Sequence, residues 1–81
     1  MDLATATALR AIVAGLRKSG AISGEPHVAA IVRELEAVEG DMKNYGTDKQ
    51  YRVRKLCMDI AADAGVTTSI KTAEAESRFN L

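Results

Sequence analysis

A regular spacing of apolar residues between positions 28 and 45 constrains the fold more than any other feature of the chain. Apolar side chains recur there at steps of three and four residues, which is the interval of one helix face. These side chains are Val28, Ile31, Leu35, Val38, Met42 and Tyr45. The seam predicts a helix over about residues 26–45, with Gly40 as its weak point. Either Ser23 caps this helix or Pro26 takes its first position.

A second helix is predicted before this one, over residues 3–18. It carries one stripe of large apolar residues and, beside it, one stripe of small residues that would permit close helix packing. The large residues are Leu9, Ile12, Val13 and Leu16, and the small ones are Ala4, Ala8, Ala11 and Gly15.

A third helix is predicted over residues 48–64. Thr47 and Gln50 have the spacing of a capping box at its start, and Gly65 followed by Val66 is a strong stop signal. Residues 68–78 favour a fourth, weaker helix, although their β-branched start could instead be extended.

The connection around Gly46 is short, so the helices on either side of it should be antiparallel neighbours. We therefore predict a single all-α domain over residues 1–81. Its architecture is a three- to four-helix bundle built on an antiparallel helical hairpin.

The core of such a bundle would be thin. Leu, Ile, Val and Phe total 18 of 81 residues, and 14 more are alanine, which contributes little buried area. A chain of this size buries only about 60% of its unfolded surface. The composition therefore predicts self-association as a dimer or small ring.

A basic cluster follows Thr47 and consists of Lys49, Arg52, Arg54 and Lys55. Residues 23–45 hold two basic and five acidic side chains, net −3, whereas residues 46–64 hold four basic and three acidic ones, net +1. We expect the two segments to pair, with Arg52 near Glu39 and Lys55 near Glu36. The whole chain has a formal charge of zero, so no overall field draws it to nucleic acid or to an anionic membrane.

The segment from Asp59 to Ser69 resembles the opening of a helix-turn-helix unit of the lac-repressor type. Ile60, Ala61, Gly65 and Val66 carry the resemblance. It implies a DNA-binding regulator with a helix-turn-helix at about 59–76, whose contacts would be Thr67, Thr68, Ser69 and Lys71. Lys71 and Glu74 stand where the second helix of that family needs apolar residues, so we treat this function as the alternative.

The leading hypothesis is a small, non-enzymatic, self-associating protein–protein interaction module. It would act as an assembly adaptor or as a regulator of a larger protein, and its size also suits a virus-encoded accessory protein. Tyr, Met and Arg are favoured in interface centres. The expected partner-binding residues are Tyr51, Arg54 and Met58, with Arg10 and Arg17 as a second exposed pair.

Residues for catalysis or metal binding are sparse. His27 and Cys57 are the only histidine and cysteine, and nothing in the spacing brings them together as base and nucleophile. We expect no enzymatic activity, no metal and no cofactor. A single cysteine fits a reducing, cytoplasmic location, and no apolar run is long enough to cross a bilayer.

Overall fold

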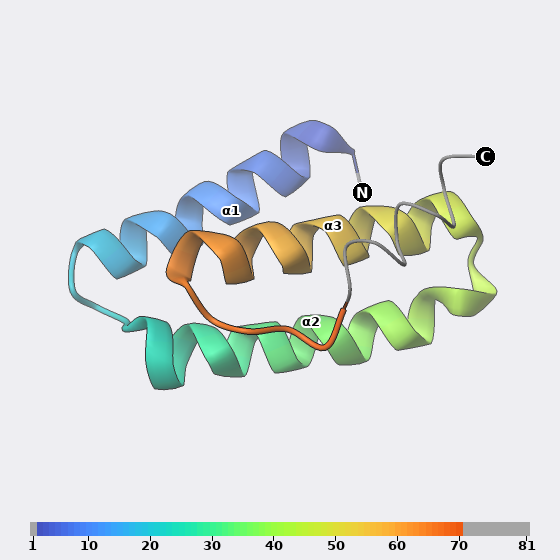
Figure 1. The fold of residues 1–81 in the computed structure, drawn as a ribbon. Helices are drawn as coiled ribbons and strands as arrows, with labels where there is room; N and C mark the ends of the chain where they lie inside the picture. Colours follow the sequence, from blue (N-terminus) through green and yellow to red (C-terminus); the bar gives the residue numbers. More distant parts are fainter. Residues whose placement is uncertain (1, 71–81) are drawn as a thin grey trace.

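The computed structural model describes residues 2–70, and this part of the chain is all-α, as predicted (Figure 1). Three α-helices pack together, and no strand occurs within the described residues. The elements in chain order are α1 (Leu3–Lys18), η1 (Gly24–Val28), α2 (Ala29–Asp41), η2 (Met42–Asn44) and α3 (Thr47–Ala64).

Helix α3 lies between the other two helices and contacts both of them (Figure 1). Helices α1 and α3 run in the same direction, and α2 runs against them. The turn η2 and Gly46 make the short link between α2 and α3. Helix α1 is therefore held to the rest of the protein mainly through α3.

The core lies between α2 and α3. Val28 and Val32 on one side and Cys57 on the other are the largest fully buried side chains, and Ala29, Leu56, Ile60, Ala61 and Val66 complete the cluster. No side chain of α1 is buried, and this helix supplies only partly covered residues such as Ala6 and Val13. The predicted thinness of the core is evident in the small size of these side chains.

The seam of α2 is rotated from the predicted one. Val38 is 45% exposed and Tyr45 is 64% exposed, whereas Glu39 is buried. The buried residues Val28, Val32 and Glu39 follow steps of four and seven residues and therefore share one face, whereas Val38 lies about 100° around the helix from Glu39. A carboxylate thus occupies an inward position that the apolar spacing assigned to valine.

Helix α1 begins as an amphipathic helix with a defined cap. Asp2 has an extended backbone, and its Oδ1 accepts a hydrogen bond from the Thr5 N–H at 2.7 Å. This bond satisfies one of the free donors of the first turn and lowers the pKa of Asp2. Arg17 and Lys18 lie in the last turn, where the helix dipole favours positive charge.

The start of α2 differs from both predicted forms. The α-helix begins at Ala29, after the short π-type turn η1, in which Glu25 is extended and the Glu25–Pro26 peptide bond is cis. Ser23 makes no side-chain cap; its hydroxyl donates to the Glu25 carbonyl at 2.5 Å. Helix α2 ends at Asp41, one residue after Gly40, and continues as η2.

The start of α3 does not form the predicted capping box. Gly46, with φ of +107°, is the N-cap, and no side chain caps the helix. Gln50 instead reaches across to α2, where its Nε2 donates to Glu39 Oε1 at 2.9 Å. The side chain that was expected to close the helix end therefore links two helices.

The stop signal at the end of α3 is confirmed. Gly65 has φ of +68°, a conformation that glycine adopts without steric cost. Its N–H donates to the Ala62 carbonyl at 3.2 Å, and the Val66 N–H donates to the Ala61 carbonyl at 3.0 Å. This is the hydrogen-bond pattern of a Schellman motif, and it turns the chain back toward α2.

Residues 66–70 are not helical, so the helix predicted from residue 68 does not begin there. The segment runs back beside α2 (Figure 1), and Ile70 packs partly against the core. Residues 71–78 of that predicted helix lie outside the described residues.

Candidate interaction site

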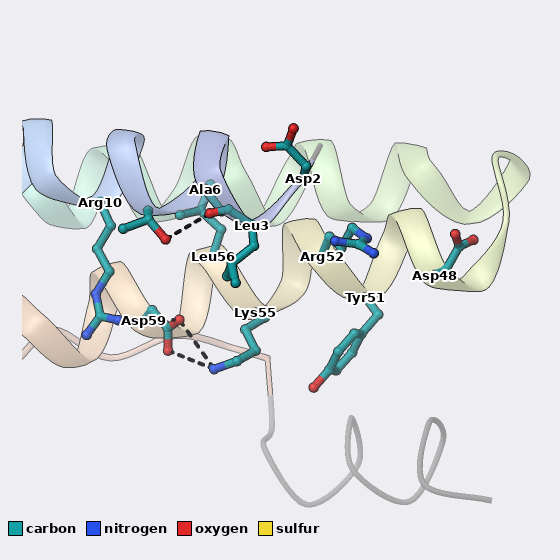
Figure 2. Close-up of a pocket in the computed structure, with 11 residues that line it drawn as sticks. Asp2, Leu3, Ala6, Arg10, Asp48, Tyr51, Arg52, Lys55, Leu56 and Asp59 are labelled. Carbon is teal, nitrogen blue, oxygen red and sulfur yellow. Dashed lines mark hydrogen bonds and ion pairs between the residues drawn. The ribbon is translucent and has the colours of Figure 1, made fainter.

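A groove separates the first half of α1 from the first half of α3, and we call it the α1–α3 groove (Figure 2). It has a volume of about 530 Å³. Leu3, Ala6 and Leu56 supply its apolar surface, and Tyr51 lines it from α3. Its charged residues are Asp2, Arg10, Asp48, Arg52, Lys55 and Asp59.

Arg10 fixes α1 to α3 at the inner end of this groove. Its Nε and Nη2 donate to the two carboxylate oxygens of Asp63 at 2.5 and 2.6 Å, and its Nη1 lies 3.7 Å from Asp59. The bidentate bond from Arg10 lowers the pKa of Asp63. Lys55 also reaches Asp59, at 3.3 Å on its own helix. Arg10 was expected as an exposed partner-binding residue; its side chain is 45% exposed, yet it is engaged within the protein.

Arg54 is buried, contrary to the expected exposed stripe on α3. Its Nε and Nη2 donate to Glu39 Oε1 at 3.0 and 2.7 Å, and each of the two side chains is 10% exposed. The predicted pairing of Arg52 with Glu39 is therefore wrong by two positions. Arg54 holds α2 to α3, and its side chain is largely withdrawn from any partner.

The predicted pairing of Lys55 with Glu36 is also wrong. Glu36 Oε2 accepts hydrogen bonds from the Thr68 hydroxyl and the Ser69 N–H, both at 2.8 Å. These bonds, with Ser69 contributing most, lower the pKa of Glu36. The carboxylate thus anchors the segment after α3 instead of a lysine of that helix.

The proposed DNA-contact residues lie in this anchored segment. Thr68 and Ser69 are bound by Glu36, and the Thr67 carbonyl accepts a weak hydrogen bond from Arg33 at 3.4 Å. A recognition helix would present the same residues from its first turn, and the described chain has no helix there. Lys71 lies outside the described residues.

The other expected partner-binding residues are only partly accessible. Tyr51 and Met58 are half-buried on α3, and Tyr51 lines the α1–α3 groove. Arg17 is half-buried on α1, beside a shallow hollow that it shares with Lys18 and Asp63. The structure therefore gathers Tyr51 and Arg10 around one groove but places Arg54 in the interior.

Cys57 and His27 are both engaged within the protein. Cys57 is fully buried, its Sγ lies 3.7 Å from the Val32 carbonyl oxygen, and burial raises the pKa of its thiol. Nδ1 of His27 accepts a hydrogen bond from the Ser23 N–H at 2.9 Å. Among residues 2–70, no three His, Cys, Asp or Glu side chains are grouped so that they could hold a metal ion.

The most exposed apolar surface of a helix lies on α1, on a side of the helix for which no partner-binding residue was predicted. Leu9, Ile12 and Leu16 are 41%, 59% and 42% exposed. The small-residue stripe beside them is exposed as well. We call these positions, with Thr5, the outer face of α1; its residues are Ala4, Thr5, Ala8, Leu9, Ala11, Ile12, Gly15 and Leu16. The sequence did contain a signal for this surface. The large and small stripes together form an uncharged face that is too wide for one neighbouring helix to cover.

In the described part of the chain, no helix is long and apolar enough to cross a membrane. Comparisons with protein-family models, curated proteins and solved structures find no match to this chain.

Proposed function

We propose that this protein is a non-enzymatic, self-associating interaction module built on the antiparallel α2–α3 hairpin. The single observation that carries this proposal is the state of α1. It is a capped helix of 16 residues with no buried side chain and with three large apolar residues exposed on one face. Apolar faces of this kind on soluble proteins commonly mark contact with another protein.

The energetics favour a partner on this face. Full burial of an exposed Leu or Ile side chain contributes about 1.5–3 kcal/mol. The exposed fractions of Leu9, Ile12 and Leu16 therefore correspond to roughly 2–4 kcal/mol per chain if they were covered. Because the stability of a small domain is itself only about 5–15 kcal/mol, this is a substantial gain for so thin a core.

The α1–α3 groove supplies a second surface, which we assign to a larger protein partner. Its apolar surface, formed by Leu3, Ala6 and Leu56, is ringed by three cations and three carboxylates. Aromatic residues such as Tyr51, which lines the groove, are enriched in protein interfaces. The groove and the outer face lie on different sides of α1, so one chain could use both surfaces at once, as an assembly adaptor does.

The state of Cys57 supports a binding role over catalysis by a cysteine nucleophile. The Cys57 thiol is buried and its raised pKa keeps it protonated at neutral pH, whereas nucleophilic catalysis needs an accessible thiolate. A free cysteine of this kind also suits a reducing compartment such as the cytoplasm.

The proposal is tested by the molar mass of the purified chain in light scattering. We expect a mass above the monomer's 8.6 kDa, and we expect Ile12→Glu to bring it down to the monomer because a charge then lies on the outer face. Ala30→Glu on the exposed surface of α2 is the matched control and should keep the higher mass. A monomeric wild-type chain at millimolar concentration would refute self-association.

A further inference from the structure

We infer that the outer face of α1 pairs with the same face of a second copy of this chain, with the two α1 helices antiparallel. This inference rests on the proposed self-association and specifies its geometry. It would make the interface isologous, the arrangement of a two-fold symmetric dimer.

The outer face consists of two parallel stripes with nearly the same spacing. The large stripe is Thr5, Leu9, Ile12 and Leu16, and the small stripe is Ala4, Ala8, Ala11 and Gly15. Both stripes follow steps of four, three and four residues, the spacing of a helix–helix seam. All eight residues are exposed, and they lie on the side of α1 turned away from the partly covered Ala6 and Val13.

An antiparallel two-fold pair brings each stripe against its own reversed copy. In the small stripe, Ala8 then lies level with Ala11 of the second copy, and Ala4 lies level with Gly15. In the large stripe, Leu9 lies level with Ile12, and Thr5 lies level with Leu16. The two residue numbers of each pair total 19 in the small stripe and 21 in the large stripe. A single placement of the two helices therefore brings the members of every pair to the same height within about one residue, or 1.5 Å of rise.

The proposed pair explains why glycine occupies position 15, which the structure of the single chain does not. A Cβ atom built on Gly15 would meet nothing within 4 Å, and its φ is not among the positive ones. Glycine in a helix interior is less favourable than alanine. A second helix backbone approaching the small stripe closely would account for a residue without a side chain at this position.

The helix dipoles favour the antiparallel direction. Antiparallel pairing sets the two dipoles in opposition, so that the positive end of each α1 lies beside the negative end of the other. Parallel pairing would place like helix ends side by side, and like partial charges so placed repel.

The size of this interface predicts a dimer that depends on concentration. Covering the large stripes of two copies gives a gain of the same order as the cost of association. Contacts of the small stripe add to this gain, so dimerisation should be reversible.

Cysteine cross-linking distinguishes the two directions. Ala4→Cys and Gly15→Cys chains are mixed and oxidised, and disulfide-linked species are identified by non-reducing electrophoresis and mass spectrometry. We expect the mixed species, which joins position 4 of one chain to position 15 of the other, to dominate. Equal positions lie about 16 Å apart along the antiparallel pair, beyond the reach of a disulfide. Buried Cys57 should not compete, and Ala30→Cys on α2 serves as the control for random collision.

A second pair keeps the test sound if Gly15→Cys disturbs packing. Ala8→Cys mixed with Ala11→Cys should give the mixed species more readily than the Ala30→Cys control. Dominant linkage of two Ala4→Cys chains to each other would overturn the antiparallel arrangement. Control-level linkage at all four positions, in a chain that light scattering shows to be dimeric, would overturn the use of this face. In both cases the proposed self-association would stand, whereas a monomer in light scattering would remove it.

Discussion

Arg54 of α3 and Glu39 of α2 form a buried ion pair in which two guanidinium nitrogens donate to one carboxylate oxygen, at 3.0 and 2.7 Å. Gln50 donates to the same oxygen at 2.9 Å and to the Glu39 carbonyl at 3.2 Å. This cluster fixes the register of α3 against α2 at the end of the helix pair where η2 and Gly46 join the two helices.

Removing one member of this pair should destabilise the fold strongly. Breaking a buried ion pair leaves an uncompensated buried charge, at a cost of about 3–5 kcal/mol, so Arg54→Ala should lower the free energy of unfolding by about 3 kcal/mol. Urea unfolding followed by circular dichroism measures this change. Arg52→Ala is the matched control on the exposed surface, where substitutions usually change stability by within about 0.5 kcal/mol. Equal losses from both variants would contradict the assigned pairing.

Acid should release the segment that follows α3. Hydrogen bonds from Ser69 and Thr68 hold the pKa of Glu36 below its ordinary value of 4.5. A depressed folded-state pKa gives stability that is present above the unfolded-state value and is lost as pH falls through the folded-state value. The urea concentration at the unfolding midpoint should therefore decrease as the pH is lowered below about 4.5. This decrease should be less steep in Glu36→Gln than in the wild type. The same acid slope in both proteins would rule Glu36 out as the cause.

The Cys57 thiol should report opening of the core. It is fully buried and its pKa is raised, so a thiol reagent at mildly alkaline pH should label native protein far more slowly than protein unfolded in urea. A chain carrying Ala30→Cys should label one thiol rapidly and the other slowly. Rapid labelling of native wild-type Cys57 would show that the space between α2 and α3 is open to solvent.

Gly15→Leu should act with opposite signs on the single chain and on the dimer. Leucine is a better helix former than glycine by about 0.5–1 kcal/mol, and no described atom obstructs the site, so α1 should become more helical. The same side chain would separate the small stripes of two copies, and we expect association to weaken at least tenfold. Sedimentation velocity and circular dichroism measure the two effects. Tighter association of the variant would contradict the close approach of the two helices.

Much of the fold could be predicted from local sequence patterns. The 3.6-residue periodicity predicted the bounds of α1 and α3 closely, and Gly65 followed by Val66 predicted the end of α3 because its hydrogen bonds are all local. The ends of α2 were less well predicted. Its start depends on the conformation around Pro26, and its inward face includes Glu39 because Arg54 and Gln50 of α3 bind that carboxylate.

The interaction surfaces were harder to predict because they depend on how helices meet. Which arginine reaches Glu39 depends on the geometry of η2 and Gly46, and a shift of two positions exchanges Arg52 for Arg54. The apolar stripe of α1 was evident, but sequence alone could not show that α3 covers only Ala6, Val13 and their neighbours. Exposure of Ile12 is a property of the assembled helices.

Concentration-dependent NMR spectra of the isotope-labelled chain show whether the outer face of α1 is an interface. On raising the concentration from micromolar to millimolar, we expect shifts concentrated at Ala8, Ile12 and Leu16, with α2 residues such as Ala30 unchanged. Spectra that do not change over this range, or shifts confined to α2, would contradict self-association through α1.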